Sequence, residues 1–262
     1  MKTRLDAELV RRGLARSREA ATDLIAAGNV LVSGMPASKA ATQVDAETSI
    51  TLKDDHAEFV SRGGHKLAGA LDKFTQIDVS GKTALDAGAS TGGFTDVLLK
   101  RGAKKVVAVD VGYGQLAWEL QKDERVKILD RVNVRNLTAA QVGEEIDLVV
   151  ADLSFISLKL VLPALISVAK EGADFLVMVK PQFEVGKEKL GAGGVVRDVH
   201  LRKEAVVAVA DSAFALTLGT LGVVASPLPG PSGNVEYFLW LRKGAPALLE
   251  VDLDLAIEKG PA

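Results

Sequence analysis

The sequence contains no cysteine, and its 262 residues include only three histidines: His56, His65 and His200. The lack of cysteine excludes disulfides, thiolate–metal sites and cysteine nucleophiles. The histidines are scattered along the chain and do not form the ligand pattern of a zinc site. We therefore predict no metal centre and a function that does not depend on thiol chemistry.

Long hydrophobic runs are also missing. The basic N-terminus, Met1 to Arg4, is not followed by an apolar segment, so we expect no signal peptide. The nearest approach to a membrane span, residues 212–225, is shorter than the ~20 residues that a span needs. Gly219 and Gly222 interrupt it, and we interpret it as the end of a core helix entering a core strand. These absences predict a cytoplasmic protein that does not contact a membrane.

The overall composition is that of an ordinary globular protein, with 48% hydrophobic and 25% charged residues. The net charge of −2 argues against a uniformly basic nucleic-acid binder but allows a local basic patch. The residue pattern divides the chain into residues 1–58, a linker at 59–66 and a larger part at 67–262. Gly63 and Gly64 predict a flexible linker, and basic residues surround them. We expect a helix to begin near Lys66.

The N-terminal part combines short helices with positive charge. Its apolar spacing predicts two amphipathic helices around Gly13, with Ser17 capping the second, followed by strand pieces near Val30 and Ile50. The first 18 residues hold six basic and two acidic side chains. Arginine-rich faces suit phosphate backbones, although such a run is also typical of a solvated helix face. The candidate RNA contacts are Arg4, Arg11, Arg12, Arg16 and Arg18, together with Arg62 of the linker.

This part resembles the small RNA-binding domain named after ribosomal small-subunit protein four. The resemblance covers nearly the whole segment and implies that its helices and strand grip structured RNA. It rests on Arg4-Leu5-Asp6, Gly13, Ser17-Arg18, Gly28-Asn29-Val30 and Val32-Ser33-Gly34.

From Thr83 onward, apolar strand-like runs alternate with helical stretches, which is typical of a doubly wound α/β sheet. Two closely spaced strands, at 221–225 and 235–241, predict an antiparallel pair at one edge of that sheet. The fold class is therefore α/β, with a Rossmann-like sheet and a small α+β domain ahead of it. The other expected strands cover residues 106–109, 126–129, 146–150 and 175–179.

A glycine-rich turn follows the first strand of this part, where residues 84–94 read ALDAGASTGGF. Glycine permits positive φ and a close approach of backbone to a ligand, and the following helix presents free N–H groups. The turn lacks the G-x-G-x-x-G spacing of a dinucleotide site. Asp110 ends the next strand, where an acid typically binds a ribose hydroxyl. We predict an adenosine-type ligand, and a plain strand–helix turn is the alternative.

The turn and Asp110 resemble the S-adenosylmethionine site of Rossmann-like methyltransferases. In that family the glycine loop passes the methionine portion, and the acid after the second strand holds the ribose. Residues after the third strand contact adenine, although Asp130 is equally suited to cap a helix. The resemblance implies S-adenosylmethionine as the cofactor, bound by Asp86, Gly88, Ala89, Ser90, Gly92, Gly93, Phe94, Asp110, Asp130 and Asn133.

Further absences from the sequence limit which chemical groups could accept the methyl group. Methylation of cytosine C5 needs a cysteine, and the segment after the fourth strand, residues 151–155, lacks the prolines typical of amine methyltransferases. A hydroxyl acceptor needs a base or a nearby cation, and lysine provides either. Lys180 and Asp152 follow apolar strands, and Glu236 is an unusual charge within the last one, so we expect these side chains near one sheet edge. A solvated strand-end charge is the alternative for each.

These positions resemble a known set. Lys66, Asp152, Lys180 and Glu236 match the Lys-Asp-Lys-Glu group of RNA ribose 2′-O-methyltransferases of the FtsJ/RrmJ type. An RNA-binding domain ahead of such a catalytic domain is similar to the TlyA family, described both as haemolysins and as rRNA cytidine 2′-O-methyltransferases. The resemblance implies Lys180 as the central catalytic group and ribosomal RNA or ribosomal subunits as partners. A membrane-lytic protein and an RNA-binding protein with an inactive methyltransferase fold are the alternatives.

Overall fold

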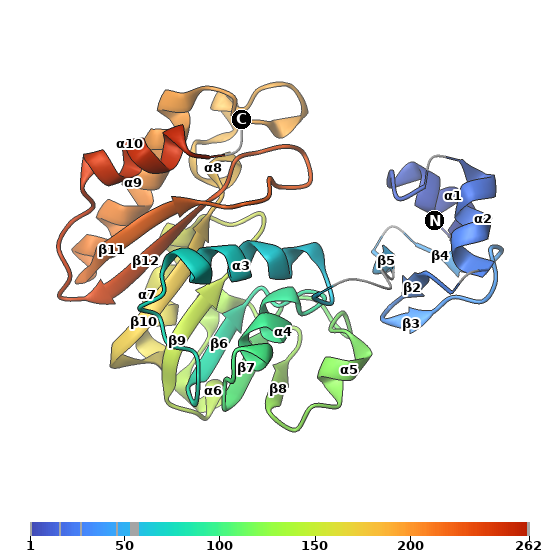
Figure 1. Cartoon of the computed structure of the whole chain (residues 1–262), viewed down its shortest axis with the longest axis horizontal. Helices are drawn as coiled ribbons and strands as arrows, with labels where there is room; N and C mark the ends of the chain where they lie inside the picture. The colour runs from blue at the N-terminus through green and yellow to red at the C-terminus, as the bar shows by residue number, and fades with distance from the viewer. Residues whose placement is uncertain (1, 16, 27, 46, 53–57, 261–262) are drawn as a thin grey trace.

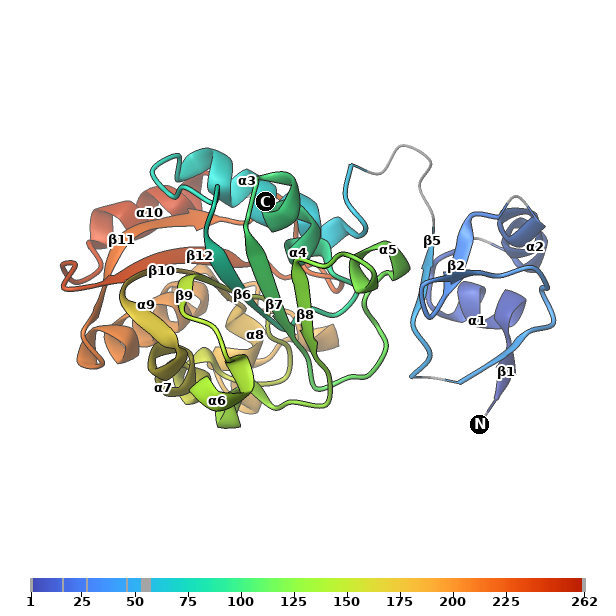
Figure 2. The ribbon, with the colours of Figure 1, turned by 90° about the horizontal axis from the view of Figure 1, so that it is seen from below.

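The computed structural model describes residues 2–15, 17–26, 28–45, 47–52 and 58–260. Figure 1 and Figure 2 show a small N-terminal domain beside a larger C-terminal domain. Arg16, one of the predicted RNA contacts, lies outside the described residues. The last strand of the N-terminal part ends at Leu52, and the described part of the chain resumes at Glu58.

The N-terminal domain packs two helices against short strands. The apolar faces of the helices and strands share one core, which includes Leu5, Leu9, Ile25 and Val30. The backbone N–H of Ala20 donates a 3.1 Å hydrogen bond to Ser17 Oγ, so the predicted cap of the second helix is confirmed. The elements are β1 (Thr3–Arg4), α1 (Leu5–Arg11), α2 (Arg18–Ala26), β2 (Val30–Val32), β3 (Met35–Pro36), β4 (Gln43–Val44) and β5 (Ile50–Leu52).

The C-terminal domain is built on a seven-stranded sheet with the order β11-β12-β10-β9-β6-β7-β8. The strands from β10 to β8 in this order are parallel, whereas β12 is antiparallel to both of its neighbours. The predicted α/β sheet and its terminal antiparallel pair are therefore confirmed. The strands are β6 (Thr83–Ala87), β7 (Lys105–Val109), β8 (Val126–Leu129), β9 (Ile146–Ala151), β10 (Ala169–Val179), β11 (Leu218–Ala225) and β12 (Tyr237–Lys243).

Helices cover both faces of this sheet (Figure 2). Successive strand residues point to opposite faces, so Ala84 joins a core with Leu67 and Val97, while Leu85 joins a core with Leu165 and Val206. Three 3-10 turns lie at Val134–Asn136, Lys187–Lys189 and Ala192–Gly194. The helices are α3 (Arg62–Lys73), α4 (Gly93–Lys100), α5 (Trp118–Gln121), α6 (Ala139–Val142), α7 (Leu158–Val168), α8 (Pro181–Glu184), α9 (Val199–Ala215) and α10 (Glu250–Glu258).

The segment predicted as a flexible linker, residues 59–66, includes the first residues of a helix. Helix α3 already begins at Arg62, four residues before the expected start. A Cβ atom on Gly64 would overlap the side chain of Phe59, and one on Gly93 would overlap Ser61. Gly64 therefore makes room for Phe59, and Gly93 lets the start of α4 lie close to the first turn of α3. Residues 62–66, expected to belong to a linker, are part of a helix.

Residues 212–225 form the end of α9, a short turn and β11, as interpreted from the sequence. Within the described ranges, no helix has the length and apolar character needed to cross a membrane. Glu236 lies one residue before β12 begins, so it is at the start of the last strand rather than within it. That position brings its side chain to the carboxyl edge of the parallel strands, because β12 runs antiparallel to β10.

Candidate active site

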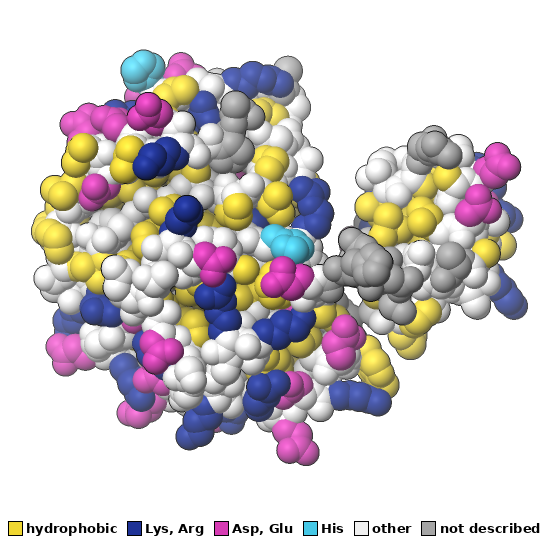
Figure 3. All heavy atoms as spheres, viewed as in Figure 1, with side chains coloured by type: hydrophobic (Ala, Val, Ile, Leu, Met, Phe, Trp, Pro, Cys, Tyr) yellow, Lys and Arg dark blue, Asp and Glu magenta, His cyan; other side chains and the backbone are white. Residues whose placement is uncertain are grey.

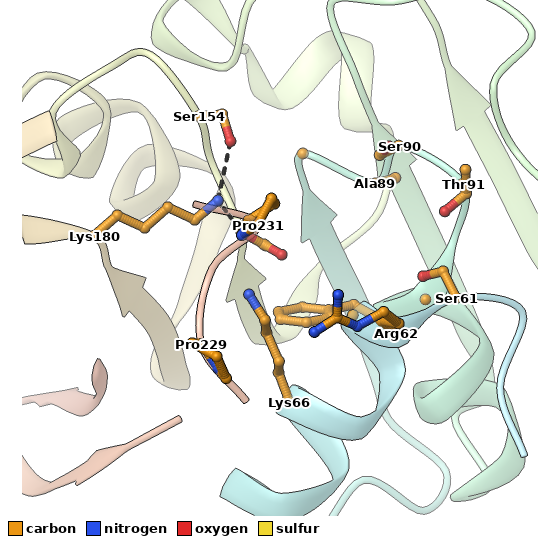
Figure 4. A pocket seen from close by; sticks show the side chains of 15 residues that line it. Ser61, Arg62, Lys66, Ala89, Ser90, Thr91, Ser154, Lys180, Pro229 and Pro231 are labelled. Carbon is orange, nitrogen blue, oxygen red and sulfur yellow. Dashed lines mark hydrogen bonds and ion pairs between the residues drawn. The ribbon is translucent and has the colours of Figure 1, made fainter. Parts of the chain in front are cut away.

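Two adjoining cavities lie where β6, β9 and β10 end. The first has a volume of about 300 Å³ and is shown in Figure 4, and the second has about 500 Å³. Both are lined by Gly88, Ser90, Asp152 and Ser154. Ligands of open α/β sheets bind in crevices at the carboxyl ends of the strands. The two cavities therefore meet at these shared residues.

The glycine turn after β6 forms one wall of both cavities. Gly88 has φ +88° and Gly92 has φ +95°, a region that residues with a Cβ rarely adopt. A Cβ atom on Gly88 would lie 2.5 Å from the carbonyl oxygen of Asp152, so this turn and the end of β9 touch backbone to backbone. Five of the residues predicted to hold the cofactor line the first cavity: Gly88, Ala89, Ser90, Gly93 and Phe94.

Asp110 and Asn133 line the second cavity, as predicted. Asp110 accepts hydrogen bonds from the backbone N–H groups of Ser90, at 2.8 Å, and Gly112, at 2.7 Å. Each of its carboxylate oxygens keeps further acceptor capacity, which ribose hydroxyls are able to fill. Apolar side chains, including Val134 and Ile156, form other walls of this cavity. An acid beside apolar walls fits an adenosine group.

Three other residues predicted to touch the cofactor do not line either cavity: Asp86, Gly92 and Asp130. Asp130 accepts a 2.9 Å hydrogen bond from the backbone N–H of Gly114 and so shapes the loop after β7. Asp86 is fully buried behind the glycine turn, where its Oδ2 accepts a 2.7 Å hydrogen bond from Thr95 and its Oδ1 has no partner. Burial is the main cause that raises the pKa of Asp86 to about 7. These residues support the loops rather than line the cavities.

Lys180 reaches the first cavity from the end of β10. Its Nζ lies 2.5 Å from Asp152 Oδ1 in an ion pair and donates a 3.0 Å hydrogen bond to Ser154 Oγ (Figure 4). Asp152 directly follows β9, the parallel neighbour of β10, so the two strand ends place both charges together. Ser154 is a partner that the sequence did not indicate, because nothing in the segment distinguishes this serine from a loop residue.

The second predicted pair joins helix α3 to the start of β12. Lys66 Nζ lies 2.6 Å from Glu236 Oε2, and both side chains are buried. Glu236 also accepts a 3.4 Å hydrogen bond from Gln182, two residues after Lys180. Figure 4 shows the side chains of Lys66 and Lys180 entering the same cavity from different elements. Three of the four positions predicted as catalytic, Lys66, Asp152 and Lys180, therefore line one cavity, and the fourth, Glu236, is buried against Lys66.

Glu184 is a further charged residue near this site that the sequence reasoning missed. Its buried carboxylate accepts hydrogen bonds from Ser157 Oγ, at 2.6 Å, and from the backbone N–H of Leu158, at 2.7 Å. It thereby caps the N-terminus of α7 from α8, and burial raises its pKa. These hydrogen bonds of Glu184 connect the segment after Lys180 with the segment after Ser154. No short-range spacing reveals such a contact between residues 26 positions apart.

The predicted RNA contacts divide into groups. Arg62 lines the first cavity, so it belongs to the active site rather than to the N-terminal domain. In that domain, Asp6 pairs with Arg4 and Arg18, and Glu8 pairs with Arg11 and Arg12. The guanidinium of Arg12 also donates to the carbonyl oxygens of Thr48 and Asp45, and only 21% of its side chain is exposed. Arg12 therefore links α1 to the β4–β5 connection, and its role as an RNA contact stays a prediction.

Comparisons with known proteins match the two parts of the chain to two different families. Residues 59–243 match the FtsJ-like methyltransferase family, and residues 3–50 match the S4 domain. A 16S/23S rRNA (cytidine-2′-O)-methyltransferase TlyA of Mycobacterium tuberculosis is 58% identical over 266 residues, which cover 99% of each chain. The chain belongs to the TlyA family.

Other relatives of this TlyA family member carry a different name. Hemolysin A of Brachyspira hyodysenteriae is 37% identical and covers 89% of this chain and 97% of its own length. A solved structure of a hemolysin-named protein from Streptococcus thermophilus superposes with a TM-score of 0.78 at 35% identity, covering 98% of this chain and 95% of the other. The full-length match shows that the same two-domain architecture extends to these proteins.

Proposed function

We propose that the chain transfers the methyl group of S-adenosylmethionine to a ribose 2′-hydroxyl of ribosomal RNA, with cytidine as the target nucleoside. The observation that carries this proposal is the convergence of Lys180, Asp152 and Lys66 on one cavity beside the glycine turn, with Glu236 buried against Lys66. The mycobacterial relative, a 16S/23S rRNA (cytidine-2′-O)-methyltransferase, supports the same substrate.

The second cavity and the turn fit the cofactor. Asp110 offers acceptors for ribose hydroxyls, the walls near Val134 and Ile156 offer apolar surface for adenine, and Gly88 keeps the backbone close to the ligand. S-adenosylmethionine, when bound, supplies an electrophilic methyl group on sulfur. Ser90 and Asp152 line both cavities, so the reacting groups are expected to meet between them.

In this proposal Lys180 is the group that meets the acceptor hydroxyl. Asp152 and Ser154 fix its ammonium from two sides, so its position is set before the RNA arrives. The Lys180 ammonium orients the ribose oxygen toward the cofactor cavity, and the carboxylate of Asp152, its ion-pair partner, receives the proton that the hydroxyl loses. Lys66, held by Glu236, adds a second positive charge beside the oxygen as negative charge develops on it.

Methyl transfer from radiolabelled S-adenosylmethionine to purified ribosomal subunits tests this function. We expect label in rRNA with the wild-type protein, at nucleotides that resist alkaline cleavage because their 2′-hydroxyl is blocked. Lys180→Ala is expected to reduce transfer by at least about 100-fold, because the acceptor oxygen is no longer positioned, while S-adenosylhomocysteine binds with unchanged affinity in calorimetry.

Two results would contradict the proposal in different ways. An unlabelled rRNA together with normal cofactor binding would indicate an RNA-binding protein with an inactive methyltransferase fold. Label at a base nitrogen or carbon, found by nucleoside analysis, would keep the enzyme class but exclude the ribose hydroxyl as the acceptor.

A further inference from the structure

The charge on the N-terminal domain is organised by two buried carboxylates. Asp6 and Glu8 both lie on α1, and each holds two arginines. On the face of the C-terminal domain seen in Figure 3, basic and acidic side chains are interspersed, without a patch of one sign. Binding of RNA by such a chain depends on where individual cations are placed, because bulk charge gives no general attraction.

Asp6 joins three elements at one point. Its Oδ1 and Oδ2 accept hydrogen bonds from Nε and Nη2 of Arg4, at 3.1 and 3.0 Å, in a two-pronged pair. Its Oδ2 also accepts a 2.8 Å hydrogen bond from Nη2 of Arg18, the first residue of α2. The Asp6 side chain is only 5% exposed, whereas those of Arg4 and Arg18 are 47% and 59% exposed. Asp6 is thus a buried anchor beneath two exposed cations.

The cations keep donors for another ligand. Each guanidinium has five N–H groups in a fixed plane, and Asp6 occupies only the Nε and Nη2 edge of Arg4. Among the described residues, no partner is seen for the Nη1 group of Arg4 or of Arg18. Hydrogen bonds from these arginines hold the pKa of Asp6 far below its usual range, so the anchor stays ionised.

The neighbouring Glu8 holds two arginines of different kinds. Arg11 resembles Arg4, since it bonds to Glu8 through Nε and Nη2 and its side chain is exposed. Arg12 bonds to backbone carbonyls of the β4–β5 connection, so Glu8 and Arg12 form a link inside the domain. Neither Arg4 nor Arg18 donates to a backbone carbonyl among the described residues, and both side chains are exposed. Asp6 is thus distinguished by holding two exposed arginines that come from different elements, β1 and α2.

We propose that Asp6 is a positioning residue for RNA binding, which holds Arg4 and Arg18 in the arrangement that receives phosphates of the ribosomal RNA. An arginine that is already fixed loses less conformational freedom when it binds, so preorganisation increases affinity for the correctly shaped target. This inference rests on the proposed function, since it concerns the same RNA substrate. It assigns a role in RNA recognition to an acidic residue, which simple charge attraction would oppose.

Asp6→Asn tests the inference, because positioning and charge predict opposite results. Loss of a negative charge alone would tighten binding to any polyanion. If Asp6 positions the arginines, we expect the KM for the ribosomal subunit that serves as substrate to rise about tenfold, with kcat changed less than twofold. Affinity for heparin is expected to increase. The matched control is Asp23→Asn, which removes an exposed acid of α2 that has no ion pair among the described residues. We expect this control to bind both polyanions slightly more tightly.

The outcomes separate the inference from the proposed function. If Asp6→Asn and Asp23→Asn bind the subunit equally well, Asp6 has no positioning role and the inference is wrong. Weaker binding of Asp6→Asn to both heparin and the subunit also overturns it, since that indicates damage to the fold. Should Asp6→Asn prove unstable in thermal melting, Asp6→Glu keeps the charge and displaces the carboxylate, and an intermediate rise in KM is expected. Failure of the wild type to methylate either subunit would instead overturn the proposed function.

Discussion

Lys66 and Glu236 form a buried ion pair, with 2.6 Å between Nζ and Oε2, across 170 positions of the chain. The lysine comes from the first turns of α3 and the glutamate from the residue before β12. Neither side chain has free access to water, so each charge depends on the other for compensation. The pair therefore connects the structure of the domain with the chemistry of the cavity.

Removing one partner of this pair is expected to harm both stability and activity. Glu236→Leu leaves the ammonium of Lys66 buried without a counter-ion, which we expect to lower the free energy of unfolding by about 3–5 kcal/mol. The double variant Lys66→Met/Glu236→Leu removes both charges and is expected to recover most of this stability in urea unfolding. Methyl transfer should remain lost in both variants. Equal stability of the single and double variants would contradict the ion-pair account.

The glycine turn is expected to be specifically sensitive at Gly88. Gly88→Ala places a Cβ atom against the carbonyl oxygen of Asp152 and forces φ +88° on a residue that avoids it. We expect affinity for S-adenosylhomocysteine, measured by calorimetry, to fall at least about tenfold, since the turn must move away from β9.

Gly81→Ala is the matched control for this prediction. Gly81 also has a positive φ, +72°, but no atom lies within 4 Å of the position of its Cβ. We expect only a small loss of stability, about 1 kcal/mol, with unchanged cofactor affinity. Equal effects of the two substitutions on cofactor binding would show that backbone strain, and not the contact with Asp152, is responsible.

Asp86 is expected to make the stability of the domain depend on pH. Its folded-state pKa of about 7 lies above the unfolded value of about 4, chiefly because of burial. Between these values the folded protein binds more protons than the unfolded chain, so the contribution of Asp86 to stability falls as pH rises. Asp86→Asn does not titrate. Its stability relative to wild type should therefore increase between pH 4 and pH 8, by roughly 4 kcal/mol at most, in urea unfolding.

The constant part of the Asp86→Asn effect is separate from this pH dependence. A buried amide without a full set of partners lowers stability by about 1–3 kcal/mol at every pH. The test is therefore the change in the difference between variant and wild type. A difference that stays constant from pH 4 to pH 8 would show that Asp86 is ionised in the folded protein throughout this range.

Glu184 is expected to matter through its hydrogen bonds rather than its charge. Glu184→Ala removes the cap of α7 and leaves Ser157 and the N–H of Leu158 without their partner, which we expect to destabilise the domain by about 2 kcal/mol. Because the segment after Lys180 is then less firmly held, kcat should also fall, by about tenfold. Glu184→Gln is able to bond both groups and should keep near wild-type stability and kcat, measured side by side with the alanine variant.

Local sequence determined much of the architecture. The alternation of apolar runs and helical stretches indicated the α/β sheet, and Ser17 marked the start of α2, because these features depend on neighbouring residues and on secondary-structure period. The glycine turn and Asp110 were also recognisable, since strand end, turn and helix start follow one another along the chain. The four predicted catalytic residues were indicated only by resemblance to a known family, because they are spread along the chain from Lys66 to Glu236.

Only the tertiary structure decided what the remaining charges and glycines do. Gly63 and Gly64 have the pattern of a flexible joint, yet both lie within helix α3, where Gly64 makes room for the side chain of Phe59. Arg12 and Arg18 look alike in the sequence. In the structure Arg12 is largely covered and bonds to the carbonyl oxygen of Thr48, whereas Arg18 bonds to Asp6 and stays exposed. Ser154 and Glu184 became visible only when strand ends and helix starts met at the cavity. The sequence determined the residue types and the local elements, whereas long-range packing set which charges are neutralised and which remain available to a ligand.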